Sequence, residues 1–453
     1  MAGCRGAARA LSSLAAAPVQ ARHEDAALVS SLLDAGTGRS TPRAKRSRAA
    51  VKLTAEGLFP FVGAPLDELV AFLDSKGVTS GHATALFTAV HRDGVSPGEA
   101  VASLPPRPAS IVSGACDLRE LEAVHDEVSE EDGTRKWLFR LPSDGAEVET
   151  VFIPEADGRG VLCVSSSVGC ALSCKFCHTG TQKLLRNLTV GEIVGQLQSA
   201  RRLLDRFPGP TPGRTQGGVS NVVFMGQGEP LLNWRSVRAA VGVMTHSRGG
   251  AVPPRRVTVS TSGVAPAMPL VASEAGCSLA LSLHGTTDET RSRVIPLNRT
   301  WGLDAVMEGL RRYTLAPSPR PPSRRQLRQE RDREETADED AAGPASPPPP
   351  SGTEVGRRMV MFEYVMLEGV NDSQEDAERL AALAAPFKCH VNLIPFNQWP
   401  GSGFRSTPDD EVRRFGETVL SRGVSCTVRW PKGRDIMAAC GQLHSEKNAA
   451  DRV

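Results

Sequence analysis

Short apolar strands alternate with helical segments from Val161 onward, and this alternation limits the fold more than any other feature of the sequence. Strands separated by helices pair in parallel, with the helices crossing over the faces of one sheet. Thr189 and Glu192 form a capping box that predicts the start of one such helix. The predicted strands are 161–165, 222–225, 256–260, 278–283, 359–366, 390–394 and 424–428. The sequence therefore predicts an α/β fold of about six strand–helix units, with its functional loops at the carboxyl ends of the strands.

Three cysteines follow the first predicted strand in a C-x3-C-x2-C pattern, at Cys170, Cys174 and Cys177. Clustered thiolates are soft ligands that suit zinc or iron–sulfur centres. A structural zinc site needs four ligands, usually as two separated pairs, and the sequence has no second C-x2-C pair. Three cysteines on a 4Fe–4S cluster leave one iron open to a substrate, which favours the cluster. A zinc site completed by His178 and three unrelated loop thiols are the two alternatives.

The residues around the triplet make the pattern more specific. The triplet itself resembles the radical S-adenosylmethionine (SAM) superfamily. The chain is also similar to the RlmN/Cfr family, whose members methylate adenosine in RNA, in the runs 163–174, 226–233 and 438–443. The resemblance covers residues 51–445 apart from one insertion. Gln227 departs from it, because the family usually has Met there, and His178 departs because the family usually has a small residue.

The resemblance implies two cofactors and a set of residues that bind them. Cys170, Cys174 and Cys177 would bind a 4Fe–4S cluster, and two molecules of SAM would be used in each turnover. The positions that match SAM-contacting residues of the family are Gly228, Glu229, Ser260, Ser282, Leu283, His284 and Asn397. Each of them alone has a simpler structural explanation. The Gly228–Glu229 pair, for example, also suits a strand-to-helix turn with an acidic residue in the first turn.

Two cysteines outside the triplet match the thiols that act directly in the family's reaction. The counterpart of Cys440 receives a methyl group and transfers it to the adenine ring. The counterpart of Cys163 then attacks the Cys440 sulfur, forms a disulfide and releases the methylated base, which is ordinary thiolate chemistry. Glu149 aligns with the proposed general base, and Glu147 is the second choice. The structural alternatives are a buried apolar thiol for Cys440, a strand-core cysteine for Cys163 and a plain strand carboxylate for the glutamate.

The resemblance therefore predicts an enzyme that methylates C2 of an adenosine in 23S-type ribosomal RNA and in transfer RNA. Methylation at C8, as in Cfr, is one alternative, and a non-catalytic RNA-binding iron–sulfur protein is the other. The predicted partners are the RNA and an electron donor such as flavodoxin or ferredoxin, and the predicted oligomeric state is a monomer. No membrane association is expected, because the sequence has no run of eighteen apolar residues.

The remaining segments divide the chain into predicted parts. Residues 1–50 are rich in Arg, Ala and Ser, with no acidic residue before Glu24, which is typical of an organellar transit peptide; an unstructured tail and a cytoplasmic enzyme are the alternative. A proline-rich, charged stretch at 315–356 cannot offset its ordering entropy by burial and predicts a disordered insertion. The other parts are a small helical module (51–110), a small β element (111–155), the radical SAM core (156–435) and a tail with Cys440 (436–453). The net charge is only +2, so any RNA contact must come from local basic patches.

Overall fold

The computed structural model describes residues 53–156, 158–204, 218–317, 319, 358–439 and 441–442 of the chain. Three sequence predictions fall wholly or mainly outside these residues. They are the targeting segment 1–50, nearly all of the insertion 315–356, and the position of Cys440.

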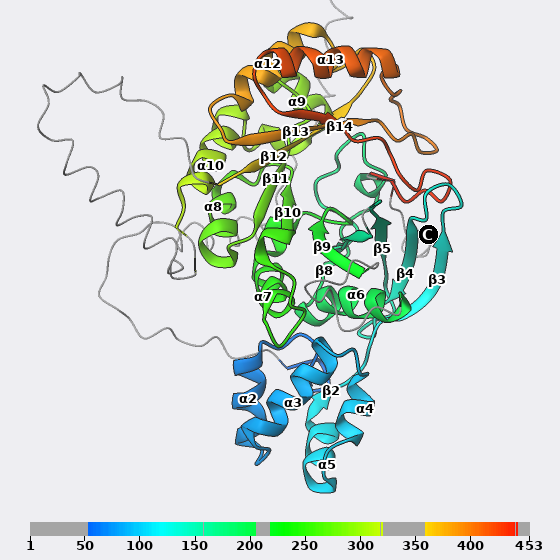
Figure 1. Ribbon diagram of the computed structural model, residues 1–453, viewed down its shortest axis with the longest axis vertical. Helices are drawn as coiled ribbons and strands as arrows, with labels where there is room; N and C mark the ends of the chain where they lie inside the picture. Colours follow the sequence, from blue (N-terminus) through cyan, green and yellow to red (C-terminus); the bar gives the residue numbers. More distant parts are fainter. Residues whose placement is uncertain are drawn as a thin grey trace, which may run out of the picture. The chain divides into compact units, whose positions relative to one another are not determined.

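A ten-stranded sheet forms the centre of the described protein, in the order β14-β13-β12-β11-β10-β9-β6-β5-β4-β3 (Figure 1). Every pairing from β6 to β14 is parallel, which confirms the predicted α/β class. The strands of this parallel part are β6 (Arg159–Cys163), β9 (Gly218–Phe224), β10 (Val257–Thr261), β11 (Ser278–Ser282), β12 (Val360–Met366), β13 (Cys389–Pro395) and β14 (Cys426–Val428). They fall where the apolar runs predicted them, with ends that differ by a few residues.

Helices connect the parallel strands, as the alternating pattern requires. They are α6 (Val190–Leu203), α7 (Trp234–Thr245), α8 (Met268–Leu270), α9 (Asp288–Val294), α10 (Leu303–Leu315), α12 (Gln374–Ala384) and α13 (Asp409–Ser421). The predicted capping box begins α6: the Thr189 hydroxyl accepts from the Glu192 N–H, and the Glu192 carboxylate accepts from the Thr189 N–H. Each side chain thus satisfies an amide that the first helical turn leaves without a partner.

The small β element is not a separate unit but extends the central sheet. Strands β3 (Glu122–Val128), β4 (Arg135–Arg140) and β5 (Glu147–Pro154) pair antiparallel with one another, and β5 pairs antiparallel with β6. The edge of β6 that would otherwise lack hydrogen-bond partners is therefore covered. Trp137 and Phe139 of β4 are fully buried, so this extension has a core of its own.

The N-terminal module contains α2 (Leu66–Ser75), α3 (Ser80–His91), α4 (Pro97–Ala102) and α5 (Pro106–Ala115), with a two-residue parallel pair β1 (Phe59–Pro60) and β2 (Cys116–Asp117). Pro106 begins α5, because proline at the first helical position loses no intrahelical bond. The module contacts α6, where the Gln198 side chain donates to the His91 carbonyl oxygen at 3.3 Å.

None of the described helices is long and apolar enough to cross a lipid bilayer.

Candidate active site

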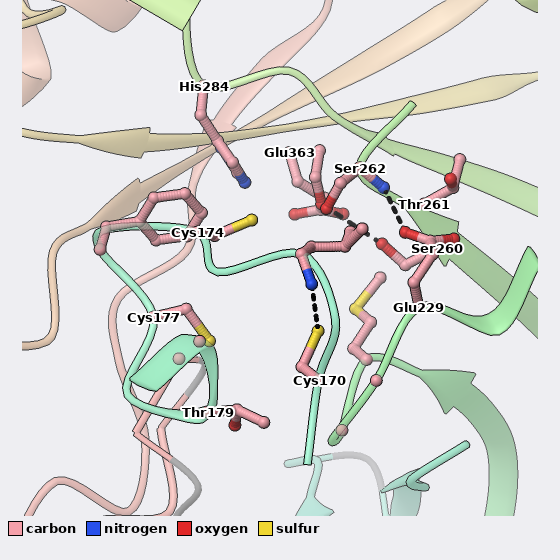
Figure 2. A pocket seen from close by; sticks show the side chains of 18 of the residues that line it. Cys170, Cys174, Cys177, Thr179, Glu229, Ser260, Thr261, Ser262, His284 and Glu363 are labelled. Atoms are coloured by element: carbon pink, nitrogen blue, oxygen red, sulfur yellow. Dashed lines mark hydrogen bonds between the residues drawn. The ribbon is translucent and has the colours of Figure 1, made fainter. Parts of the chain in front are cut away.

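A cavity lies at the carboxyl ends of the parallel strands, where the fold class predicts functional loops (Figure 2). All three cysteines of the triplet line it, together with residues from the ends of β9, β10, β11, β12 and β13. Five of the seven predicted SAM-contacting residues also line it, namely Gly228, Glu229, Ser260, Ser282 and His284. The fold thus brings together residues that are spread over more than a hundred positions of the sequence.

The cysteine loop follows β6 and lies between two short strands that pair antiparallel, β7 (Ser167–Val168) and β8 (Arg186–Asn187). Ser173 inside the loop has a φ of 53°, in the left-handed region, which turns the chain so that it wraps around the cavity. Three contacts hold the loop from outside. The Lys175 N–H donates to the Val294 carbonyl at 2.9 Å, the Trp399 indole donates to the Phe176 carbonyl at 3.0 Å, and the His178 N–H donates to the Gly441 carbonyl at 2.7 Å.

The environment of the triplet opposes negative charge in the absence of a metal. Burial, and next the charges of Cys177 and Glu229, raise the pKa of the Cys170 thiol to about 12. Burial also raises the pKa of the Cys174 thiol well above its usual range. Among the described residues that line the cavity there is no Lys or Arg to stabilise a thiolate. A bound cationic centre would supply the positive charge that three thiolates need here.

Glu229 lies on the β9–β10 side of the cavity and is held by backbone amides. Its Oε2 accepts from the Ser262 N–H at 2.8 Å, and its Oε1 accepts from the Leu231 N–H at 3.1 Å. Burial raises the pKa of Glu229 to about 7, although these hydrogen bonds oppose the shift. A carboxylate in this position is prepared to stabilise a cationic ligand group such as an ammonium.

Gly228 has a φ of 98°, and a β-carbon there would lie 2.0 Å from the Ser167 hydroxyl oxygen. We expect Gly228→Ala to destabilise the protein by about 2–4 kcal/mol, because it adds both backbone strain and a steric clash. Urea unfolding under anaerobic conditions measures the change. Gly242→Ala is the matched control: Gly242 lies in α7 with nothing within 4 Å of its added β-carbon, so we expect a gain of about 0.5–1 kcal/mol. Equal stability of the two variants would contradict this account of Gly228.

The wall made by β10 and β11 presents hydroxyl groups and one imidazole to the cavity. The Ser260 and Ser282 hydroxyl oxygens lie 3.5 Å apart. His284 Nδ1 accepts from the Val365 N–H at 3.0 Å, so the neutral ring has its proton on Nε2. Burial, and next the charge of Arg291, lower the pKa of His284 to about 3, so the ring is a neutral hydrogen-bond donor at physiological pH.

Two predicted SAM-contacting residues do not line the cavity. Leu283 is fully buried, and its N–H donates to the Glu363 carbonyl at 3.0 Å. Asn397 is buried in the loop after β13, where its Oδ1 accepts from Arg434 Nε at 3.3 Å.

Cys163 ends β6 and packs against the C-terminal loop. It is only 7% exposed and belongs to an apolar cluster with Val151, Val223, Ile436 and Ala438. Ala438 is two positions before Cys440 in the sequence. The described residues shortly before Cys440 in the sequence therefore lie beside Cys163.

The antiparallel extension holds this C-terminal loop in place. The Lys432 ammonium donates to the Pro154 carbonyl at 2.8 Å, and the Gly433 N–H donates to Asp132 Oδ2 at 2.8 Å. The Lys136 ammonium also donates to the Ile436 carbonyl. Nothing in the sequence pattern indicated that the small β element has this role, because its contacts cross some three hundred positions of the chain.

Glu149 lies near Cys163 but does not line the cavity. Val151 pairs with Cys163 between β5 and β6, and alternate residues of a strand share a face, so Glu149 is on the same face of β5 as that pair. It is buried. Glu147, the second choice for a base, forms an ion pair with Arg140 at 3.2 Å.

Comparisons with known proteins agree with this geometry. A family model described as the radical SAM superfamily matches residues 164–317. The dual-specificity RNA methyltransferase RlmN of Parvibaculum lavamentivorans is 42% identical over 386 residues, which cover 84% of this chain and 87% of that protein. The protein of the same name from Paracoccus denitrificans is 47% identical over 315 residues, 69% of this chain and 70% of that protein.

This chain belongs to the RlmN family of radical SAM RNA methyltransferases. A crystal structure of a radical SAM methyltransferase from Sphaerobacter thermophilus has the same fold, with a TM-score of 0.70 and 35% identity over 85% of this chain and 99% of that one. The predicted family membership is thus confirmed, and with it the prediction of an enzyme.

Membership in the radical SAM superfamily implies an iron–sulfur cluster and SAM. The residues of this RlmN family member fit both groups: the three thiols of the triplet and the Glu229 carboxylate share one cavity without a basic side chain among its described lining residues. Within the described ranges, no three or more His, Cys, Asp or Glu side chains are grouped to bind a single metal ion. A cluster binds its cysteines through separate iron atoms and does not need such a group.

Two sequence hypotheses find no support in the structure. The zinc site completed by His178 has no matching group of ligands among the described residues, and the His178 ring instead stacks on Trp399 with centroids 4.6 Å apart. The disulfide has no support either, because no disulfide joins any two of the described cysteines, which include Cys163. Its other predicted member, Cys440, lies outside the described residues, so a transient disulfide stays part of the reaction proposed below.

The structure adds residues to the cavity that the sequence analysis missed. Glu363, Thr261 and Ser262 all line it. A sequence signal existed for Glu363, which is a single carboxylate inside the apolar strand Val-Met-Phe-Glu-Tyr-Val-Met. Such a residue is rarely buried without a partner, and that alone marks it for attention.

Proposed function

We propose that this enzyme methylates C2 of an adenosine in 23S-type ribosomal RNA and also accepts transfer RNA. Two similar proteins named dual-specificity RNA methyltransferase RlmN support this proposal. The structural observation that supports it most is the position of Cys163. This thiol packs against Ile436 and Ala438, which are four and two positions before Cys440 in the sequence, at the same end of the sheet as the cysteine triplet.

In the proposed site, Cys170, Cys174 and Cys177 hold a 4Fe–4S cluster with one open iron, and two SAM molecules are used per turnover. When bound, these cofactors supply the methyl group and the radical. Glu229 accepts hydrogen bonds from the SAM ammonium, since its carboxylate already lies beside the triplet. The apolar side chains of the lining, such as Leu172, Phe176 and Val365, limit water around the reacting centre.

The two other thiols and one carboxylate complete the proposed chemistry. Cys440 would hold the methyl group as a thioether. The radical that the cofactors supply would remove one hydrogen from that methyl group, and the carbon would then bond to C2 of the adenine ring, with the surplus electron returned to the cluster once the ring proton is lost. Cys163 then attacks the Cys440 sulfur, so that a sulfur–sulfur bond forms as the sulfur–carbon bond breaks and the base leaves. Glu149, on the same face of the sheet as Cys163, removes the proton from the ring carbon.

The proposal is tested by anaerobic reconstitution with iron, sulfide and SAM labelled in its methyl group, followed by nucleoside analysis of the RNA. We expect labelled 2-methyladenosine in ribosomal RNA and in transfer RNA. Labelled 8-methyladenosine would show that the enzyme methylates C8 and that the assignment of C2 is wrong. A cluster-loaded protein that binds RNA but transfers no methyl group would show that the chain is a binding protein.

We expect substitution of Cys170, Cys174 or Cys177 with serine to remove nearly all cluster iron, because each thiolate is one of only three protein ligands. Iron content and the electron paramagnetic resonance spectrum of the reduced protein measure this loss. Cys389→Ser is the matched control, because Cys389 is a free, half-buried thiol of β13 outside the cavity. A wild-type protein that binds one zinc and no iron would overturn the cluster assignment.

We further propose that the enzyme works as a monomer, takes its electrons from a flavodoxin or ferredoxin, and is imported into a plastid or mitochondrion. The import proposal rests on the Arg/Ala/Ser-rich residues 1–50. A full-length fluorescent fusion is expected in the organelle, and deletion of residues 2–50 should leave activity in vitro unchanged. A full-length fusion that stays in the cytosol would contradict import.

A further inference from the structure

A buried carboxylate on β12 has no role in the chemistry described above. Glu363 lines the cavity and is only 4% exposed. Its Oε1 accepts from the Asn392 amide at 2.9 Å, whereas its Oε2 is buried with no hydrogen-bond partner among the described residues. Figure 2 shows the Glu363 side chain among the residues that line the cavity, near Ser260 and Ser262. An acceptor left unpaired in such a place calls for a ligand.

The neighbours of Glu363 engage its Oε1 and leave only Oε2 for a ligand. Asn392 Oδ1 accepts from the Thr427 hydroxyl at 3.3 Å, which fixes the amide so that its nitrogen faces Glu363. The β11–β12 register places Ser282 directly beside Glu363, and the Ser282 hydroxyl lies 3.5 Å from that of Ser260. Along the wall from β10 to β12, the cavity is therefore lined by the hydroxyls of Ser260 and Ser282 and then by Glu363 Oε2.

This row of groups matches one part of SAM better than the others. SAM has three kinds of hydrogen-bond donor: the ammonium, the two ribose hydroxyls and the adenine amino group. The ammonium is taken by Glu229 in the proposed site, and Glu229 is on the β9–β10 side of the cavity. Vicinal hydroxyls both donate and accept, so they suit a wall of serine hydroxyls that ends in a carboxylate acceptor.

We propose that Glu363 Oε2 accepts a hydrogen bond from a ribose hydroxyl of SAM and so selects a ribonucleoside cofactor over a deoxyribonucleoside. This inference rests on the proposed function, because SAM is its ligand. Asn392 acts as a positioning residue that holds the carboxylate in its orientation.

The test measures binding and not turnover. The dissociation constants of SAM, 2′-deoxy-SAM and 3′-deoxy-SAM are measured by anaerobic calorimetry on the cluster-loaded full chain, without reductant or RNA. We expect wild-type protein to bind SAM at least about 10-fold more tightly than one of the two deoxy compounds, the effect of one hydrogen bond to a charged group. This measurement needs no variant, and equal affinity for all three compounds would overturn the proposal.

Glu363→Gln then tests the residue itself. The Asn392 amide would still donate to the Gln oxygen, which would put an amide nitrogen where Oε2 was, so a donor replaces the acceptor. We expect SAM affinity to fall by about 10-fold, while affinity for the discriminated deoxy compound changes by less than about 3-fold. Glu368→Gln is the matched control, because Glu368 lies just beyond β12 in an exposed ion pair with Arg405, and all three affinities should stay at wild-type values.

The outcomes separate this inference from the proposed function. Wild-type protein that loads a cluster but binds no SAM would overturn the proposed function. If Glu363→Gln folds, loads iron and still discriminates against the deoxy compound as the wild type does, the assignment of Glu363 falls and the proposed function stands. N6-methyl-SAM is measured in the same way. If wild-type protein binds it more weakly than SAM and Glu363→Gln does not, the contact is to the adenine amino group, and the ribose assignment is overturned.

Discussion

Cys163→Ala is expected to turn the enzyme into one that stays covalently attached to its RNA. Without this thiol, the Cys440 thioether carbon can still bond to the adenine ring, but no nucleophile remains to break the sulfur–carbon bond. Cys163 is well placed for that attack, because it packs against Ile436 and Ala438 just before Cys440. A disulfide requires α-carbons within roughly 7 Å. Ala438, which contacts Cys163, is only two positions before Cys440 in the sequence.

Denaturing gel electrophoresis with labelled RNA measures this effect. We expect a protein–RNA species that survives denaturation, and almost no free methylated adenosine. Cys440→Ala should abolish methylation without any adduct, and Cys426→Ala, at a buried free thiol of β14, should leave turnover intact as the matched control. Normal release of methylated adenosine by Cys163→Ala, with no crosslinked species, would show that the thiol roles are wrong.

Arg291→Met is expected to be the most destabilising single substitution near the site, at about 3–5 kcal/mol. Arg291 is fully buried, and burial lowers its pKa to about 10, which leaves it charged at neutral pH. Its guanidinium donates to the Leu283 carbonyl at 3.0 Å, to the Ser262 carbonyl at 2.5 Å and to Asn298 Oδ1 at 2.6 Å. It thus joins the loops after β10 and β11, and these loops position Glu229 and His284.

Urea unfolding gives the stability change, and SAM binding gives the effect on the site. Arg291→Lys should recover little, because an ammonium cannot reach three acceptors that a planar guanidinium joins. Arg311→Met serves as the control: this arginine of α10 is exposed and pairs with Glu308, so the change should be less than about 1 kcal/mol. An Arg291→Met protein as stable as wild type would contradict the role of this side chain as a clamp.

The sequence predicted the parallel sheet well because its strands are short apolar runs bounded by helical patterns. The resemblance to the RlmN/Cfr family predicted that Cys170, Gly228 and Ser260 bind cofactors, and all three line the cavity, where strand ends meet at one edge of the parallel sheet. Prediction was weaker where structure depends on contacts between distant segments. The pairing of β5 with β6 and the hydrogen bond from the Gly433 N–H to Asp132 are of this kind. Neither leaves a local pattern in the sequence.

Individual polar residues show the same limit. Glu363 was visible as a charge in an apolar strand, but only the fold shows that it faces the cavity and that Asn392 occupies one of its oxygens. Arg291 gave no signal, because it lies in α9 among other charged residues. Leu283 and Asn397 were predicted by resemblance alone, and the structure places neither of them in the lining of the cavity.

The parallel pairing of β11 with β12 joins two strands that lie on either side of the long proline-rich stretch 315–356. Forming that pair requires the chain to close a loop, but doubling the length of a flexible loop costs only about 0.6 kcal/mol. Extra residues at this point are therefore nearly neutral for folding. A slip of one residue in β12 is not, because it would move Glu363 to the opposite face of the sheet and put a neighbouring apolar side chain in the cavity. The length of the connection can drift through evolution while the register of the strand that follows it stays fixed.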